Sequence, residues 1–182
     1  PGYVKVFNFD GSNWSQLGED INGELNIDAF GQSVSLSSDG KILAVGARQA
    51  SSNHPGYVKV FNFDGSNWSQ LGNTVKGEGN GDSFGFAISL SSDGNSLGIG
   101  GFYNSNTKTN SGHVKIYNFK DNSWVQIGNQ INGKEENENL GVYLNLSSDG
   151  RKVAICTQTN FLTVYNLVDS DIQPIALPQT VT

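Results

Sequence analysis

The stretch that decides the fold is Pro1–Gly18, PGYVKVFNFDGSNWSQLG, because it returns letter for letter as Pro55–Gly72. A looser third copy, GHVKIYNFKDNSWVQIG, runs from Gly112 to Gly128, and a degraded fourth, NFLTVYNL, lies at Asn160–Leu167. Offsets of 54 and then 56 residues separate the first three copies. Because such spacing is the signature of propellers, solenoids and related arrays, the sequence predicts a repeat protein.

Three further sets of markers recur in step with these copies. They are Phe30-Gly31, Phe84-Gly85 and Leu140-Gly141; Ser37–Gly40, Ser91–Gly94 and Ser147–Gly150; and Ala44–Ala47, Gly98–Gly101 and Ala154–Thr157. We therefore divide the chain into residues 1–27 (the outer half of a first blade), 28–81 (a second blade), 82–137 (a third) and 138–182 (a divergent terminal blade). These form one continuous repeat domain.

Each complete unit is predicted to contain four short strands, at 31–37, 41–47, 56–63 and 67–71 in the second blade and at matching positions in the third. Asp39-Gly40 supplies a tight turn between the first two. The terminal segment has Pro174 and Pro178, and we expect a capping or edge strand around Ile175–Leu177.

The third strand of the unit carries apolar side chains on both of its faces. Val58 and Val60 alternate with Tyr57, Phe61 and Phe63, and a strand that is apolar on both sides must be covered on both sides. Four-stranded antiparallel sheets stacked radially provide that cover. The predicted fold class is therefore all-β, a β-propeller-type array of about three and a half repeats.

Composition excludes several classes of partner. Charged residues make up 15% of the chain and the net charge is −6. With no cluster of Lys or Arg, neither nucleic acid nor an anionic membrane is an expected partner. No apolar run approaches the ~20 residues that span a bilayer. Because the chain has no Met and opens in the middle of a repeat, we expect it to be a processed product or a piece of a longer protein or assembly.

The residues resemble the FG-GAP-type (integrin α-like) β-propeller repeats. The resemblance lies in Asp28–Val34, then Leu43–Ala47 and Gly56–Phe61, and it covers the chain to about Leu167. Integrin-type blades often carry an Asp-rich calcium loop between their first two strands. Here that connection is Ser-Ser-Asp-Gly, with one carboxylate, whereas Ca²⁺ takes 6–8 oxygen ligands. The resemblance therefore implies the fold without the calcium site.

Three repeated residue types are candidates for chemistry. Asp28, Asp82 and Glu138 place one acid in each unit, and we favour hydrogen bonds to turn amides over acid–base work. The aromatic side chains of Trp14, Trp68 and Trp124 could stack on sugars, but their strict repetition favours packing between blades. His54 and His113 lie at loop-to-strand junctions without partners spaced for zinc, so we expect solvated or capping roles.

The remaining candidates are weaker. Cys156, the only cysteine, lies in a predicted strand; we favour a buried and inert side chain over a link to another chain. The stretch Asn8–Asn13 is interpreted as a hairpin turn, not as a metal loop. N-glycosylation acceptor triplets begin at Asn13, Asn67 and Asn145, of which the last lies in a predicted strand.

No catalytic, cofactor-binding or metal-binding set is recognised, and the sequence predicts that the chain is not an enzyme. The leading hypothesis is a non-enzymatic, extracellular or cell-surface module for structure, adhesion or binding, with a protein or glycan ligand. The first alternative is self-assembly, in which another copy completes the unpaired opening strand Gly2–Phe9 head to tail. The second is a carbohydrate-active propeller enzyme, which would need two carboxylates ~5–10 Å apart.

Overall fold

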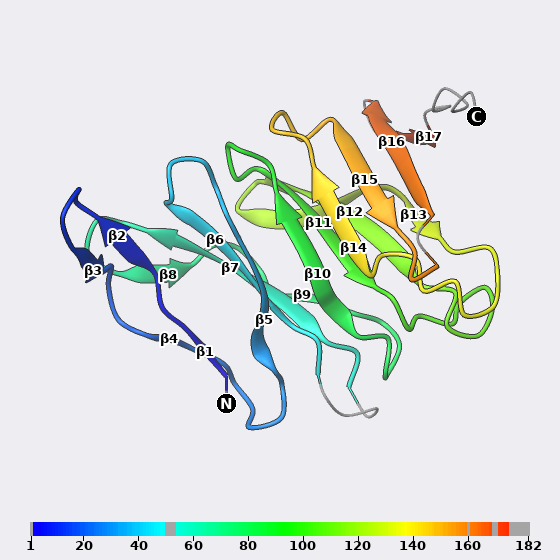
Figure 1. Cartoon of the computed structure of the whole chain (residues 1–182), viewed down its shortest axis with the longest axis horizontal. Helices are drawn as coiled ribbons and strands as arrows, with labels where there is room; N and C mark the ends of the chain where they lie inside the picture. The colour runs from blue at the N-terminus through cyan, green and yellow to red at the C-terminus, as the bar shows by residue number, and fades with distance from the viewer. Residues whose placement is uncertain (1, 50–53, 160, 169–170, 175–182) are drawn as a thin grey trace.

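The computed structural model describes residues 2–49, 54–159, 161–168 and 171–174 of the chain. These residues form strands and connections and contain no helix. Among them no helix is long and apolar enough to cross a membrane. The strands form antiparallel sheets that follow one another along the molecule (Figure 1). The all-β, antiparallel part of the fold prediction is confirmed, while the described strands form no closed sheet.

We group the strands into four units, in chain order. The first unit holds β1 (Tyr3–Val4), β2 (Phe7–Phe9), β3 (Trp14–Gln16) and β4 (Ile21–Asn22), paired as β1-β4 and β2-β3. The second holds β5 (Phe30–Leu36), β6 (Ile42–Ala47), β7 (Tyr57–Phe63), β8 (Trp68–Gln70) and β9 (Val75–Lys76). The third holds β10 (Phe84–Leu90), β11 (Ser96–Gly101), β12 (His113–Lys120) and β13 (Ser123–Asn132). The fourth holds β14 (Tyr143–Leu146), β15 (Lys152–Cys156), β16 (Leu162–Val168) and β17 (Asp171–Pro174).

One strand expected from the sequence needs correction, and another lies outside the described residues. The opening strand predicted at Gly2–Phe9 is broken into β1 and β2, although its letters are those of the continuous β7. In the second unit β6 pairs along the whole length of β7, whereas the first unit has no such strand among its described partners. The edge strand expected around Ile175–Leu177 lies outside the described residues.

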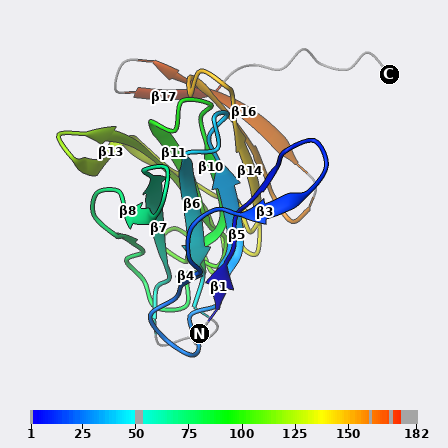
Figure 2. The same ribbon diagram turned by 90° about the vertical axis from the view of Figure 1, so that its left-hand side faces the viewer.

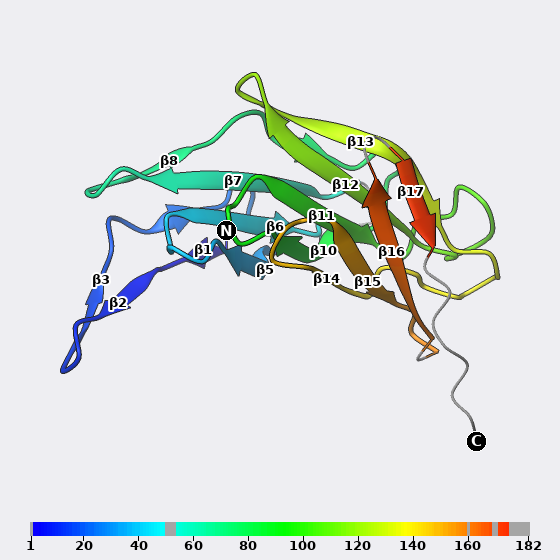
Figure 3. The ribbon, with the colours of Figure 1, turned by 90° about the horizontal axis from the view of Figure 1, so that it is seen from above.

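The units pack face to face, as the view from above shows (Figure 3). We call the face turned toward the preceding unit the leading face and the opposite one the trailing face. Leading residues Leu43, Val45 and Phe61 of the second unit pack on Val4 and Val6 of the first. Trailing residues join the core shared with the third unit, which includes Ala44, Val58, Val60, Leu97 and Ile99. The predicted two-sided cover of β7 is therefore confirmed.

Glycines bring successive sheets into close contact. Gly85, in the Phe-Gly pair that opens the third unit, has a φ of 87°, and its carbonyl oxygen accepts a hydrogen bond from the Ser33 hydroxyl at 2.7 Å. A Cβ atom added at Gly46 would overlap that same carbonyl oxygen, and one added at Gly100 would overlap the carbonyl of Gly141. The units can approach this closely only because these strand positions lack a side chain.

The serine-containing turns connect the opposite ends of the units. In the Ser-Ser-Asp-Gly turn, the Asp39 carboxylate accepts hydrogen bonds from the Ser37 hydroxyl at 2.6 Å and from the Lys41 amide at 3.0 Å. The Ser38 amide donates to the Ser92 carbonyl, and the Ser92 amide donates to the Ser148 carbonyl, each at 2.9 Å. One motif therefore closes each hairpin and ties it to the next.

We predict that Gly46→Ala destabilises the protein by about 1–3 kcal/mol, because the new methyl group forces the second and third units apart. Equilibrium urea unfolding measures the change. The matched control is Cys156→Ala at the corresponding strand position of the fourth unit, which should cost less than about 1 kcal/mol. Equal losses in the free energy of unfolding for the two variants would contradict the close-contact role of Gly46.

Candidate functional site

Residues of the connection that enters the third unit, β9–β10, and of a connection within it, β11–β12, line a cleft. The cleft has a volume of about 480 Å³. Its lining consists of polar and aromatic residues from the β9–β10 and β11–β12 connections, namely Asn80, Gly81, Asp82, Tyr103, Ser105 and Asn110. We call it the loop-end cleft.

Asp82 is the buried carboxylate of this cleft. It accepts hydrogen bonds from the side-chain amide of Asn104 at 2.7 Å and from the backbone amide of Gly79 at 3.0 Å. Burial raises the pKa of Asp82 above its usual value, and these two donors offset the effect only in part. A carboxyl group with a raised pKa beside a cleft is a typical feature of functional sites.

The second unit holds the corresponding acid differently. Asp28 accepts a hydrogen bond from the Tyr57 hydroxyl at 2.6 Å and others from the amides of Glu24, Leu25 and Phe30. Burial alone would raise the pKa of Asp28, but the hydrogen bond from Tyr57 and those from the three amides hold it below its usual value. The cleft at this repeat position, lined in part by Tyr57, measures only about 180 Å³.

The difference between the two clefts follows from one exchange in the repeat. Tyr57 pairs with Ala47 in the second unit, and the corresponding pair in the third is His113 with Gly101. His113 makes no hydrogen bond to Asp82, and Asn104 from the longer β11–β12 connection takes the place of the tyrosine hydroxyl. The third unit thus has a buried acid bound to a loop amide, beside a larger cleft.

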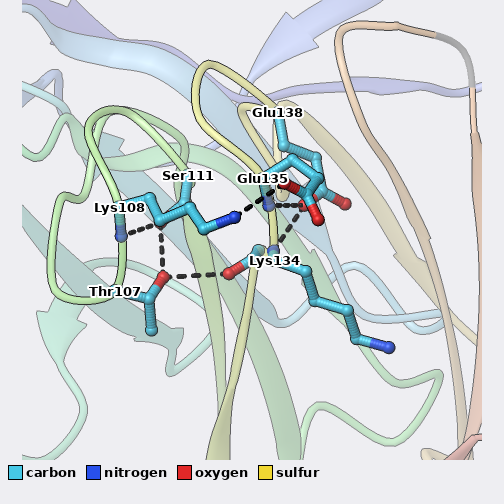
Figure 4. Close-up of polar contacts among 7 residues, drawn as sticks. Thr107, Lys108, Ser111, Lys134, Glu135 and Glu138 are labelled. Atoms are coloured by element: carbon cyan, nitrogen blue, oxygen red, sulfur yellow. Dashed lines mark hydrogen bonds and ion pairs between the residues drawn. The ribbon is translucent and has the colours of Figure 1, made fainter.

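The β11–β12 connection, which supplies Tyr103, Ser105 and Asn110 to the cleft, contacts the β13–β14 connection (Figure 4). The Thr107 hydroxyl donates to the Gly133 carbonyl at 2.9 Å and lies 2.7 Å from the Ser111 hydroxyl. The exposed ion pair between Lys108 and Glu135 measures 2.7 Å, and exposed pairs contribute little to stability. The hydroxyl contacts therefore fix the β11–β12 connection against residues 133–138.

The repeated acids occupy the roles that the repeat pattern predicted. Asp28 and Asp82 cap loop amides, and Glu138 accepts hydrogen bonds from the Lys134 and Glu135 amides (Figure 4). Only Asp82 of the three lines the loop-end cleft. The structure therefore places the acids in separate loops and does not bring them together as a catalytic pair.

The prediction of solvated or capping roles has a different outcome for each of the two histidines. His54 is exposed, as predicted. The prediction for His113 is wrong, because this side chain is fully buried and packs edge-on against Phe84, with ring centroids 5.9 Å apart. Neither ring nitrogen has a hydrogen-bond partner. Burial, followed by the nearby Lys115 ammonium, lowers the pKa of His113 to about 4.

The tryptophans pack between units, except for the first. The indole of Trp68 donates to the Leu17 carbonyl at 2.9 Å, and that of Trp124 donates to the Leu71 carbonyl at 3.0 Å. The predicted packing role is confirmed for these two. Trp14, in the first unit, is 68% exposed.

The other candidates lie outside the cleft. Asn13 and Asn67 are exposed in hairpin turns, where Asp10 and Asp64 accept the backbone hydrogen bonds of the turn, as the hairpin interpretation predicted. Asn145 is exposed on β14. Cys156 is half-buried instead of buried. Among the described residues, no group of three His, Cys, Asp or Glu side chains could hold a metal ion.

The sequence did not single out the residues that line the cleft beside Asp82, namely Asn80, Tyr103, Ser105 and Asn110. A signal for them was present. The β11–β12 connection differs in length and letters from the β6–β7 connection, although the strands on either side of it match. Variable loops between constant strands are where repeat proteins place their binding residues.

Comparison with known proteins supports the fold alone. No protein-family model matches the chain, and no curated protein matches it either. A solved structure of a provisionally assigned 6-phosphogluconolactonase from Bacteroides uniformis matches 94% of this chain and 47% of its own, with a TM-score of 0.64 and 15% identity. The β-propeller domain of Myceliophteria thermophila Cps50 (Swd1) matches 82% of this chain and 39% of its own, with a TM-score of 0.52 and 12% identity. The chain therefore spans less than half the length of these two structures.

The first of these matches corrects one prediction. The absence of a recognisable catalytic set predicted that the chain is not an enzyme. The likeness to a provisionally assigned lactonase over 94% of the chain contradicts that prediction.

We predict that His113 makes the protein less stable in acid. Its pKa is about 4 when folded, against about 6.5 when unfolded. Stability should therefore fall as the pH drops from about 6.5 to about 4, by up to about 3 kcal/mol, because only the unfolded state takes up the proton. In urea unfolding at several pH values, His113→Phe should remove this part of the pH dependence, while His54→Gln at the exposed site should not. A profile that His113→Phe leaves unchanged would contradict the assignment.

Proposed function

We propose that this chain is an arc of an FG-GAP-like β-propeller array that binds a carbohydrate in the loop-end cleft. The observation that carries the proposal is the cleft of about 480 Å³ over the buried carboxylate of Asp82. The propeller architecture is supported by the stacked antiparallel sheets, by the Phe-Gly contacts between them and by the likeness to a β-propeller domain.

The chemistry of the lining favours a neutral, hydroxyl-rich ligand. The amides of Asn80 and Asn110 and the hydroxyl of Ser105 can both donate and accept hydrogen bonds, as sugar hydroxyls do. Tyr103 lines the cleft and is 45% exposed, and an aromatic side chain suits the apolar C–H side of a sugar. The carboxylate of Asp82 and the net charge of −6 disfavour an anionic ligand.

The setting that we propose is extracellular or at the cell surface, where the module would serve as a binding or adhesion scaffold. The acceptor triplets at Asn13 and Asn67 support this setting, because both lie in exposed hairpin turns. These turns close the ends of the units opposite the loop-end cleft, so a glycan attached there would leave the cleft accessible (Figure 1).

A second candidate function is hydrolysis of a sugar lactone at the same cleft. Two observations favour it, namely the likeness to the provisionally assigned 6-phosphogluconolactonase and the raised pKa of Asp82. A carboxyl group that stays protonated closer to neutral pH can transfer a proton to a leaving oxygen. Asp82→Asn would then abolish lactone turnover in a pH-stat assay, while Asp28→Asn in the second unit would retain it.

We predict that a glycan array screened with the purified chain identifies at least one neutral oligosaccharide ligand. Tyr103→Ala and Asn80→Ala should each weaken its binding about tenfold or more in calorimetry, because they remove the ring face and an amide of the cleft. The matched controls are Gln49→Ala and Asn26→Ala, which lie 54 residues earlier at the same repeat positions. Absence of any glycan ligand, or equal losses in the control variants, would refute the proposed function.

A further inference from the structure

The second unit uses both carboxylate oxygens of its buried acid. The Phe30 amide donates to Oδ1 of Asp28 at 3.1 Å. The Tyr57 hydroxyl and two backbone amides donate to Oδ2. Groups within the protein therefore satisfy this carboxylate, as is usual for a buried polar group.

The third unit leaves one oxygen of the corresponding acid without a donor. Asp82 accepts both of its hydrogen bonds, from Asn104 and Gly79, at Oδ2. The repeat equivalent of Phe30 is Phe84, whose amide donates to the Pro55 carbonyl at 3.1 Å. Among the residues that the structure describes, none donates a hydrogen bond to Oδ1 of Asp82.

This oxygen reaches solvent, although Asp82 as a whole is only 5% exposed. In the described part of the chain, the polar side-chain atoms that are both enclosed and without a partner belong to Arg48, Gln49 and His113. Oδ1 of Asp82 has no partner but is not one of these atoms, so it is not enclosed. Because Asp82 lines the loop-end cleft, the oxygen reaches solvent there.

We propose that Oδ1 of Asp82 selects the ligand of the loop-end cleft by accepting a hydrogen bond from one of its hydroxyl groups, so that the cleft takes sugars in which this hydroxyl is free. The inference rests on the function proposed above and names the atom that decides its specificity. A hydroxyl that donates to a carboxylate forms a charge-assisted hydrogen bond, which is stronger than a bond between neutral groups. A ligand without this donor leaves the buried carboxylate unsatisfied and loses affinity.

A second residue of the lining also carries an acceptor without a donor. The side-chain amide of Asn110 donates to Oδ1 of Asn137 at 3.0 Å, which directs its nitrogen toward the β13–β14 connection. No described residue donates to the Oδ1 atom of Asn110 itself. The lining thus contains two acceptor oxygens of this kind, which match a ligand with more than one free hydroxyl.

Neighbouring units hold these loops on both sides. The third unit lies between the second and the fourth (Figures 1 and 2), and its core packs on both. The Gly81 amide donates to the His54 carbonyl at 3.1 Å, and the Asn139 side chain donates to the Phe102 carbonyl at 3.1 Å. The acceptor of Asp82 is therefore preorganised, which reduces the entropic cost of binding.

Asp82→Asn reverses the hydrogen-bonding character of this position. Because Asn104 and Gly79 both donate to Oδ2, the amide oxygen of the variant takes that place and its NH2 group takes the place of Oδ1. The variant therefore donates a hydrogen bond where the unmodified chain accepts one. The two bonds that hold the side chain are retained.

The test is an NMR titration of the 182-residue chain and its variants with the methyl glycosides of glucose, galactose and mannose. Each glycoside is compared with derivatives in which fluorine replaces one hydroxyl, because fluorine accepts a hydrogen bond but cannot donate one. For a glycoside that binds, one fluoro derivative should bind the unmodified chain about tenfold more weakly or worse. Asp82→Asn should lose this preference, because its amide can donate to fluorine.

The matched control is Asp121→Asn, which makes the same change of charge in the exposed β12–β13 turn of the third unit and should keep the preference. Urea unfolding checks that the variants fold, and the comparison of hydroxyl with fluorine on the unmodified chain needs no variant. Equal binding of a glycoside and all its fluoro derivatives, or a preference that Asp82→Asn retains, overturns the inference and leaves the proposed function standing. Failure of all three glycosides to bind refutes the proposed ligand class, and the inference with it.

Discussion

The approach of one backbone to the next at glycine is the constraint on which this structure depends. At Gly46 the carbonyl of Gly85 lies where a side chain would begin, and Gly100 and Gly141 repeat the arrangement one unit on. This contact sets the spacing between sheets, so that Val58 and Val60 of one unit reach Leu97 of the next. The same spacing lets the Ser35 hydroxyl accept a hydrogen bond from the Leu90 amide at 2.9 Å. The sequence therefore repeats because each unit packs against an equivalent neighbouring unit.

Because each unit packs against an equivalent neighbour, most of the fold could be predicted from the repeated sequence. The alternation in Tyr57–Phe63 predicted a strand covered on both sides, and the recurrence of Asp39-Gly40 predicted its hairpins. The break between β1 and β2 could not be predicted, because identical letters form the continuous β7. Strand continuity here depends on pairing with β6, a long-range property that local sequence does not contain.

The candidate site was harder to predict, because it arises where the third unit differs from the repeat pattern and carries no recognisable motif. The acids at Asp28 and Asp82 share their spacing, but Tyr57 binds the first and Asn104 binds the second. Sequence reasoning treated His113 as a solvated junction residue, although it replaces the tyrosine that fills the second unit's cleft. Its burial against Phe84 depends on the sheet register, in which Phe84 on β10 and His113 on β12 both pair with Gly101 on β11, and only the structure shows that register.

The central claim is that the exchange of Tyr57 for His113, together with the longer β11–β12 connection, makes the third unit the ligand site. NMR titration of the side-chain amides with a neutral oligosaccharide tests it most directly, because each unit carries asparagines that report on its own loops. The account predicts that the resonances of Asn80, Asn104 and Asn110 shift together and saturably, while that of Asn26 stays fixed. Shifts centred on the exposed indole of Trp14, with the loop-end asparagines unmoved, would contradict it.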